Sequence, residues 1–561
     1  MSVMKKIIYL LVLVFAVTSY SCKKDFLQRD VGIQSDLEEV FKDPLTASRF
    51  GDFTYTFSIT DYGRLSGYKG MTSQFTDESI ANNGQIEVAA MNSGQFLDPG
   101  ASDVTGIYTQ MYRGIRNANL MLANMDKTPW SELYNPNYIK GEQLYLRAYF
   151  YFELLRRFGG VVILTEPQDF TEAATDLPRS TYAETMTRVM TDLDQSIALL
   201  PLTNADWPNP AAQANRATGA AAMALKARVL LFDASPLNNP TNDIAKWQKA
   251  TAASKAIIDL NKFSLEANYA NVLTVPNSNE YIRIWPRGGR GFIGTYLSDF
   301  LIPTSYGGAQ SNLSPVQNHV DLYEMSNGKA ITDPTSGYNP QSPYANRDPR
   351  FYVNILYNGA TWQGRAVQTW QTEPNAQGVI SYGQDISTAT SITKTSYYLK
   401  RLWPEASRSG STASAMLNYV FYRYAEVLMN YAESLNEELG ATTEVYNAVN
   451  AIRKRAGMPD LPTGLTKEQM RDRIKNERAI EFAFEDMRWW DILRWKQGEP
   501  LVAQPMKGMK VIRNTNGSFT YTVVELPAFQ KVFKEHMYRY PIPRAEMNKT
   551  SGALKQNPGW E

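Results

Sequence analysis

The sequence is poor in the residues that usually build reactive sites. It has one cysteine, Cys22, and two histidines, His319 and His536, among 561 residues. A single thiol cannot form an internal disulfide, and the histidines stand far apart without a cysteine beside them. No HExxH, CxxC or serine-elbow pattern is present. We therefore expect no metal site and no catalytic residues, and we expect both histidines to be ordinary surface or packed residues.

Net charge is also scarce. The chain has 57 Lys and Arg against 56 Asp and Glu, a formal charge of +1, and no charge block or Gly/Ser-rich or Pro-rich linker divides it. A nearly neutral chain with mixed signs offers no electrostatic footprint for a nucleic acid. We expect one compact body and no nucleic-acid partner.

Long apolar runs are missing as well. The run Ile7–Val17 holds 11 residues, whereas a spanning helix needs about 20. Basic residues precede it and small polar residues follow it, the order of a secretory signal. Cys22 comes next in a context that resembles a bacterial lipobox, although Ser19 stands where leucine is usual. We predict a signal peptide at 1–21 and lipidation of Cys22, whose acyl chains would hold the chain at a membrane. The alternative is a soluble secreted protein with an unmodified thiol.

Aromatic residues, by contrast, are abundant. There are 33 Tyr, 23 Phe and 11 Trp, more than a helical core usually requires, and many lie in segments without helical periodicity. Apolar residues spaced three or four apart predict helices at 104–125, 138–158, 181–200, 214–234, 243–260, 417–437, 443–456 and 467–497. Between 262 and 416 the pattern gives way to Gly, Pro, Asn, Ser and Tyr with short strand-like runs.

These patterns predict a mostly α fold for residues 22–561. Short connections between successive helices favour helix hairpins of tetratricopeptide-like character, spaced irregularly rather than at a strict repeat. The hairpins would form a scaffold over about 35–260 and 417–561, with 262–416 as a loop-rich insertion. Loops of this length in a compact domain are usually functional.

Eight stretches in order give the chain a specific resemblance. They are MYRGIRNANLML (111–122), RAYFYFELLRRFGGVVIL (147–164), RATGAAAMALKARVLLFDASP (216–236), PYANRDPRFYVNILYNG (343–359), YRYAEVLMNYAESLNE (422–437), VNAIRKRAGMP (449–459), NERAIEFAFEDMRWWDILRW (476–495) and YPIPRAEMN with QNPGW (540–560). With the lipobox-like start, they resemble the SusD/RagB family of Bacteroidetes outer-membrane lipoproteins nearly end to end.

The resemblance implies a binding protein rather than an enzyme. Members of the family are lipid-anchored at the outer membrane, face the cell surface, and act with a SusC-like TonB-dependent transporter to which they pass oligosaccharides or, in some members, peptides. No cofactor is implied. The helix hairpins would form the scaffold and the transporter-facing surface, and the long loops would carry the ligand site.

Two motifs invite enzymatic interpretations. Glu477, Glu481 and Glu485 follow one another at intervals of four, but glycoside hydrolysis needs two acids facing each other across a substrate. We interpret them as ion-paired at a helical junction with Arg478, Arg488 and Arg494, above Trp489, Trp490 and Trp495. The glycines at 289, 291 and 294 match a dinucleotide fingerprint in spacing only, because prolines interrupt both flanking segments. A lipoprotein glycosidase remains the alternative from another class.

Sugars present apolar C–H faces edged by hydroxyl groups, so a shallow glycan site needs flat aromatic platforms and a few polar partners. Aromatic residues in irregular segments, outside the family's structural motifs, meet the first condition: Trp285, Tyr296, Tyr306, Trp362 and Tyr397. As polar partners we add Arg365 and Asp77, whose position is similar to one often near family ligands. Each of these aromatic residues could instead simply pin its loop.

Overall fold

The structure is a computed structural model that describes residues 37–560 except for 61, 63–69, 83–85, 96–101, 169–176, 211–214, 286–300, 302, 308–310, 388–391, 404, 406–416 and 551. The predicted signal peptide, Cys22, Tyr296 and the glycines at 289–294 lie outside the described residues.

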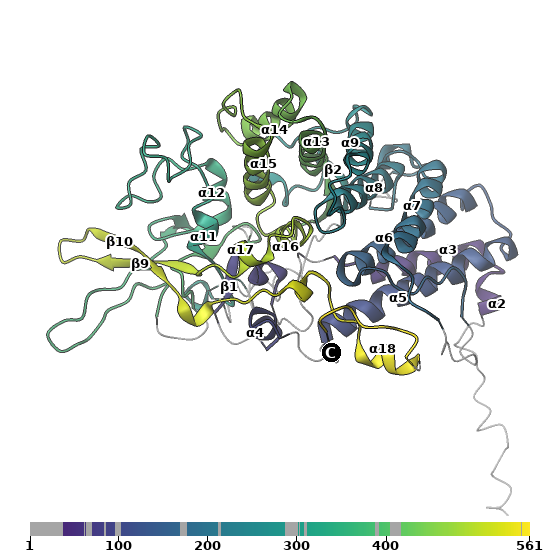
Figure 1. The fold of residues 1–561 in the computed structure, drawn as a ribbon, viewed down its shortest axis with the longest axis horizontal. Coiled ribbons are helices and arrows are strands. Elements are labelled where there is room, and N and C mark those ends of the chain that lie inside the picture. Colours follow the sequence, from purple (N-terminus) through teal and green to yellow (C-terminus); the bar gives the residue numbers. More distant parts are fainter. Residues whose placement is uncertain are drawn as a thin grey trace, which may run out of the picture.

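A curved row of helices forms one half of the molecule (Figure 1). Its main members, in chain order, are α5 (Ser102–Asn124), α6 (Pro136–Phe158), α7 (Tyr182–Leu199), α8 (Gly219–Ala234), α9 (Ile244–Ile258), α13 (Tyr424–Leu439), α14 (Thr443–Arg455) and α15 (Lys467–Glu481). Successive helices pack against each other, and α9 packs directly against α13. This stack of helix hairpins confirms the predicted mostly α, tetratricopeptide-like scaffold.

Local sequence signals set the helix ends. The side chain of Thr181 caps α7 and Glu184 returns the bond, which satisfies two backbone donors at once. Helix α6 begins with Pro136 behind an Asn135 cap and ends before Gly159, whose φ of 75° favours glycine. Every residue of α6 from Gly141 to Phe158 is buried. Its neighbours in the scaffold therefore enclose most of its length.

The predicted helix 417–437 is wrong in its first part. Residues Tyr419–Arg423 form strand β8, which pairs antiparallel with β2 (Tyr281–Trp285). The sequence YVFYR is rich in aromatic residues that suit a pleated, half-buried surface. An apolar stripe alone does not distinguish such a strand from the first turn of α13.

The predicted helix 467–497 is also wrong, because it is interrupted. Helix α15 ends at Glu481, and α16 (Arg488–Arg494) and α17 (Gly498–Val502) follow. Phe484 and Asp486 have φ values of 60° and 61°, which end a right-handed helix. Distant residues hold this turn: Phe484 N donates to a carboxylate oxygen of Glu78 at 3.0 Å, and Thr72 donates to Asp486 at 2.6 Å.

The other half is built from short elements, and we call the described residues of 54–95, 262–418 and 503–533 the loop-rich half. Apart from β2, which pairs with β8, its strands form two-stranded antiparallel pairs: β1 (Ser79–Ala81) with β3 (Leu313–Pro315), β4 (Ile355–Leu356) with β7 (Tyr398–Leu399), β5 (Thr361–Trp362) with β6 (Arg365–Ala366), and β9 (Lys507–Arg513) with β10 (Phe519–Glu525). Its helices are α4 (Ile86–Asn92), α11 (Gln317–Val320) and α12 (Pro349–Asn354). Three parts of the chain thus contribute to the loop-rich half: the predicted insertion 262–416 and segments that lie before and after it in the sequence.

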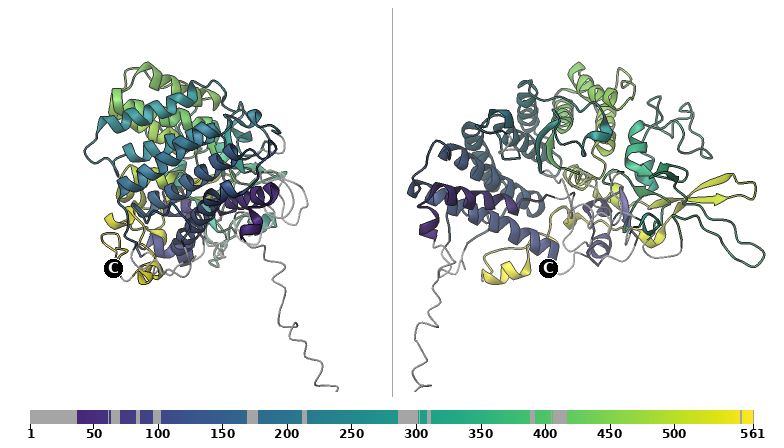
Figure 2. Two further views of the ribbon diagram at one scale, coloured as in Figure 1. Left: turned by 90° about the vertical axis from the view of Figure 1, so that its right-hand side faces the viewer. Right: turned by 180° about the vertical axis from the view of Figure 1, so that it is seen from behind.

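The remaining helices lie at the edges of the scaffold: α2 (Leu37–Val40), α3 (Pro44–Phe53) and α18 (Arg544–Lys549). The β9–β10 hairpin projects at the end of the molecule opposite to α2 and α3 (Figure 2). No helix among the described residues is long and apolar enough to cross a membrane.

Candidate ligand-binding site

A tight hairpin in the loop-rich half positions two of the predicted ligand-binding residues. Strands β5 and β6 are joined by Gln363 and Gly364, whose φ values of 47° and 83° define a two-residue turn with both residues left-handed. Such a turn matches the twist of a hairpin and favours glycine at its second position. It sets Trp362 directly opposite Arg365, so that both side chains leave the same face of the hairpin.

Arg365 is fixed by a buried carboxylate. Its two terminal nitrogens donate to the two oxygens of Asp385, each at 2.7 Å. The same carboxylate accepts from Ser305 Oγ at 2.5 Å and from the Gln368 backbone N–H at 2.7 Å. The hydrogen bonds from Arg365 to Asp385, together with the Asp385 charge, raise the pKa of Arg365 above its ordinary value. The guanidinium is therefore a permanent cation held in one orientation, and about 29% of the side chain stays exposed.

An aromatic cluster lies beside this ion pair. The Arg365 guanidinium stacks on the ring of Tyr306 at 3.8 Å, and Tyr306 meets the edge of Trp403 at a centroid distance of 5.4 Å. Trp403 in turn contacts Trp362 at 5.3 Å. We call Tyr306, Trp362, Arg365, Asp385 and Trp403 the Tyr306 cluster.

Only the outer members of the cluster can meet a ligand in this structure. Trp362 is 3% exposed and Trp403 is completely buried, whereas Tyr306 is half-buried and Arg365 partly exposed. Burial, with the nearby Asp385 charge, raises the pKa of Tyr306 to about 12, so its phenol stays protonated. The surface thus offers one tyrosine ring and one oriented guanidinium, supported from below by two indoles. Such a pair can hold a polar ligand that has an apolar face.

The structure places the other predicted residues elsewhere. Tyr397 is completely buried, and its hydroxyl donates to Gln317 at 2.6 Å. Trp285 is partly buried against the main core, paired with Tyr419 across β2 and β8. Direct ligand contact by these two residues stays a prediction, and contact by Tyr397 would require it to leave its pocket.

Asp77 has a partner that the sequence could not reveal. Its two oxygens accept from Arg488 at 2.8 and 2.7 Å, and its side chain is buried. Burial opposes ionisation, but the arginine outweighs it and lowers the pKa of Asp77 below its ordinary value. In this structure Asp77 joins the segment before strand β1 to helix α16, and its role toward a ligand stays a prediction.

Trp403 is a member of the cluster that sequence reasoning missed. It lies in an irregular stretch, YYLKRLWP, and meets the criteria used for the other aromatic candidates. Lys400, in the same stretch, lies 5.0 Å from the Trp362 ring and donates to the Tyr352 carbonyl. The signal was available in the sequence, but nothing in it identified the contact with Trp362.

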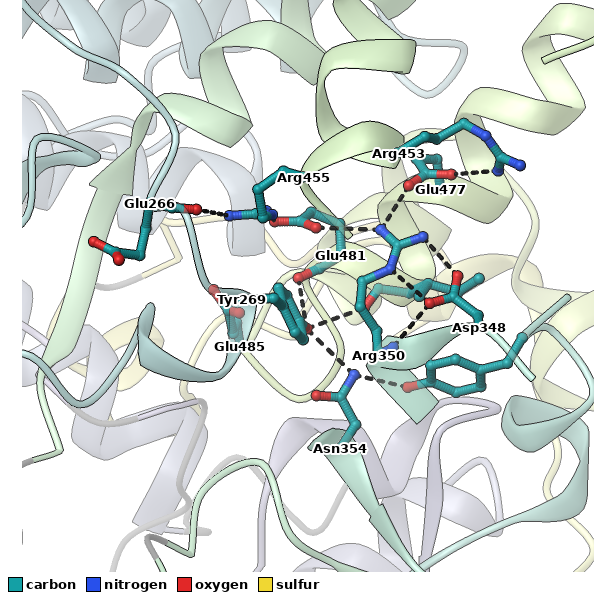
Figure 3. Close-up of polar contacts among 12 residues, drawn as sticks. Glu266, Tyr269, Asp348, Arg350, Asn354, Arg453, Arg455, Glu477, Glu481 and Glu485 are labelled. Atoms are coloured by element: carbon teal, nitrogen blue, oxygen red, sulfur yellow. Dashed lines mark hydrogen bonds and ion pairs between the residues drawn. The ribbon is translucent and has the colours of Figure 1, made fainter. Parts of the chain in front are cut away.

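The three glutamates of the acidic motif belong to a buried charge network that joins the two halves (Figure 3). Arg350 of α12 binds Glu477 at 2.6 Å and Glu481 at 3.2 Å, while its other nitrogens donate to Asp348. Glu485 accepts from Arg401 at 2.7 Å. Each of these side chains is buried or nearly so.

The expected ion pairing of these glutamates is present, but the predicted partners are wrong. Glu477, Glu481 and Glu485 pair with arginines from α12, β8, α14 and the segment after β7, namely Arg350, Arg401, Arg423, Arg453 and Arg455. Arg478, Arg488 and Arg494 instead bind Asp491, Asp77 and Glu433. Although burial opposes ionisation, three arginines lower the pKa of Glu481 to about 2. These carboxylates are thus committed to structure.

Both histidines are packed residues in this structure. His319 is completely buried between Tyr323 and Phe484, and burial lowers its pKa to about 3. His536 packs against Trp560 at 4.3 Å. Among the described residues, no group of His, Cys, Asp and Glu is arranged to hold a metal ion.

Comparison with known proteins gives matches over most of the chain. The family model described as "SusD family" matches residues 272–560, and the model described as "Starch-binding associating with outer membrane" matches residues 58–231. SusD-like protein P38 of Formosa agariphila is 24% identical over 74% of this chain and 76% of its own length. SusD-like protein P2 of the same organism is 31% identical, but that match spans only 26% of each chain.

The fold has close counterparts among solved structures. A SusD-like carbohydrate binding protein of Bacteroides fragilis superposes with a TM-score of 0.76 and 23% identity, over 92% of this chain and 99% of that one. At this level of identity the similarity concerns the fold.

Proposed function

This chain belongs to the SusD family, and we propose that it is a non-catalytic lipoprotein of the outer membrane that binds oligosaccharide at the cell surface and delivers it to a SusC-like TonB-dependent transporter. The family match carries this proposal. It is supported by the starch-binding description of the family model that matches residues 58–231 and by the B. fragilis counterpart, which is a SusD-like carbohydrate binding protein. Peptide cargo and a glycosidase activity are the alternatives.

We place the glycan contact at the Tyr306 cluster. A pyranose ring could stack on the exposed part of Tyr306, where the Arg365 guanidinium would donate to ring hydroxyl groups. The arginine is pre-oriented by Asp385 at 2.7 Å, so little conformational entropy is lost when a ligand binds. Because Asp385 already accepts from Arg365, Ser305 and Gln368, we assign it a positioning role and no catalytic one.

Affinity electrophoresis in gels containing neutral polysaccharides tests this site. Tyr306→Ala should abolish the retardation that the wild-type protein shows on its preferred glycan, because losing one platform costs about 2 kcal/mol or more and about 1.4 kcal/mol is a tenfold change in affinity. Tyr306→Phe keeps the ring and is the matched control; it should bind like the wild type. Equal retardation of wild type and Tyr306→Ala would place the site elsewhere.

The non-enzymatic part of the proposal has its own test. Incubation of the purified protein with every glycan that it retards should generate no new reducing ends. Release of reducing sugar that persists after removal of contaminating hydrolases would favour the glycosidase alternative.

The anchor and the transporter are tested in cells. Cys22→Ala should move the protein from the membrane to the soluble fraction, while the wild type should be removed from intact cells by added protease. The wild type should also co-purify with a TonB-dependent barrel in moderate salt, since a nearly neutral protein gains little from charge steering. A Cys22→Ala protein that stays in the detergent phase would contradict the anchor, and purification without a barrel would contradict delivery.

A further inference from the structure

A cavity lies within the helical scaffold, away from the loop-rich half. It has a volume of about 500 Å³ and is bounded by the turn between α8 and α9, by α13 and α15, and by the end of α16. Its lining includes Trp247, Asn436, Arg471, Ile474, Lys475 and Trp495. This volume suits a ligand of one or a few sugar-sized rings. Figure 1 shows α9, α13 and α15 side by side around this part of the scaffold.

One wall of the cavity carries an unsatisfied acceptor. Asn436 is completely buried, and its amide nitrogen donates to the Lys467 carbonyl at 3.0 Å. Its side-chain oxygen has no hydrogen-bond partner within the described part of the chain. Buried acceptors of this kind are rare in folded proteins and call for an explanation. A ligand that places a hydroxyl or N–H group in the cavity would supply the missing donor.

The same cavity carries a cation that lacks a carboxylate partner among the described residues. Lys475 lies on α15 with its ammonium 5.2 Å from the centre of the Trp495 ring, and no carboxylate of the described residues is hydrogen-bonded to it. Burial lowers the pKa of Lys475, because desolvation disfavours its charged form. An incoming anion would offset that cost.

Other cations bind the two acids of the cavity, and the charges of Glu433 and Asp472 only partly offset the burial of Lys475. Glu433 accepts from Arg494 at 2.6 Å, and Glu437 accepts from Arg471 at 2.6 Å. Lys467 adds a second cation to Glu437. The balance of charge in the cavity therefore favours a ligand with a negative group.

We propose that this cavity binds a carboxylated sugar, such as a uronic acid unit. Its carboxylate would meet the Lys475 ammonium, a ring hydroxyl would donate to the free oxygen of Asn436, and an apolar ring face would lie against the cavity wall lined by Trp495 and Ile474. The cavity alone indicates that the ligand carries an anionic group and a hydrogen-bond donor. The choice of a sugar rests on the proposed function.

Titration with glucuronate at low salt, followed by protein NMR or calorimetry, tests this inference, with glucose as the neutral probe. Wild-type protein should bind glucuronate and not glucose, and the affinity should fall as salt rises. Lys475→Gln should weaken glucuronate binding at least tenfold. Lys249→Gln removes an exposed lysine of α9 outside this cavity and should change nothing. Equal binding by wild type and Lys475→Gln, or equal binding of both sugars, would overturn the proposal.

Tyr306→Ala separates this cavity from the loop site. It should keep glucuronate binding intact while it loses neutral glycan. Glucuronate binding that depends on Lys475 in a protein that binds no neutral glycan would uphold this cavity and refute the loop site. Loss of glucuronate binding in Tyr306→Ala would instead assign the anion to the loop site and overturn the inference.

Discussion

The two halves of the molecule are held together by different interactions. In the scaffold, helix α6 is buried from Gly141 to its end at Phe158, and the helices satisfy their own backbone groups. In the loop-rich half, irregular backbone leaves carbonyl groups that need side-chain donors. Arg347 supplies three of them: it is buried and donates to Val320 and Tyr323 at 2.7 Å and to Pro343 at 2.8 Å.

The same contrast describes how the halves join. Arg350 and Arg401 belong to the loop-rich half. The glutamates that they bind lie on α15 and in the turn after it. A loop held by buried charges keeps its position only while both partners remain, because removing one leaves an unpaired charge in the interior. The loop-rich half should therefore be sensitive to changes of charge, and the scaffold to changes of volume.

The largest effect is expected from Arg350→Ala, which leaves Asp348, Glu477 and Glu481 without a shared cation. Breaking a buried ion pair in this way typically costs about 3–5 kcal/mol. Hydrogen exchange should show faster exchange in α12 and the loops beside it than in α6. Lys255→Ala breaks an exposed pair with Asp259 and should leave the melting temperature almost unchanged, because exposed ion pairs contribute little. Equal melting temperatures for the two variants would refute the role given to the network.

A substitution that leaves an empty volume in the helical core should loosen the scaffold rather than the loop-rich half. Leu225 of α8 is completely buried in the main core, and Leu225→Ala should cost about 2–5 kcal/mol. Exchange should rise in α7, α8 and α9, while the peptides around Arg350 should stay protected until global unfolding. Selective loosening of the loop-rich half by this variant would contradict the division.

The pH dependence of stability tests the contact between β1 and the turn at 482–487. Burial raises the pKa of Glu78 to about 8, above the ordinary value of about 4.3. The folded state then holds a proton that the unfolded state releases, so stability falls as pH rises from about 4 to 8, by at most about 1.4 kcal/mol per pH unit. Arg488, Asp77 and Asp486 face the same group.

Glu78→Gln keeps an acceptor for Phe484 N and has no proton to lose. Its melting temperature, relative to the wild type, should rise between pH 5 and pH 8. Parallel curves for the two proteins across this range would show that Glu78 does not titrate as described.

The smallest change in stability is expected from Arg365→Ala. Its side chain is partly exposed, and the buried Asp385 keeps its hydrogen bonds from Ser305 and Gln368, so the loss of stability should be smaller than for Arg350→Ala. Neutral glycan binding should nevertheless fall at least tenfold, because the oriented guanidinium is lost. Arg513→Ala, which removes the guanidinium 4.8 Å from the Trp370 ring outside the cluster, should bind like the wild type. A large drop in the melting temperature of Arg365→Ala would make it a structural residue instead.

Sequence periodicity was enough to predict the scaffold, because helices are local structures with a repeating apolar face. It failed at Tyr419–Arg423 and after Glu481, where partners from distant segments decide the backbone: β2 for the strand, and Glu78 and Thr72 for the turn. Such contacts leave no periodic signal.

The candidate site was predictable in composition but not in geometry. Choosing aromatic residues from irregular segments selected Tyr306 and Trp362, and Arg365 was chosen as their polar partner; the structure brings all three together. The same criterion cannot separate an exposed ring from a buried one. The partner of Asp77 is 411 residues away, so its burial in an ion pair could not be foreseen.

Hydrogen exchange in the presence and absence of the preferred neutral glycan tests the central claim most directly. The account predicts that ligand slows exchange in the peptides that carry Tyr306 and residues 361–366, while α6, α8 and α13 exchange as in the free protein. Protection confined to those scaffold helices, with none around Tyr306, would contradict a glycan site in the loop-rich half.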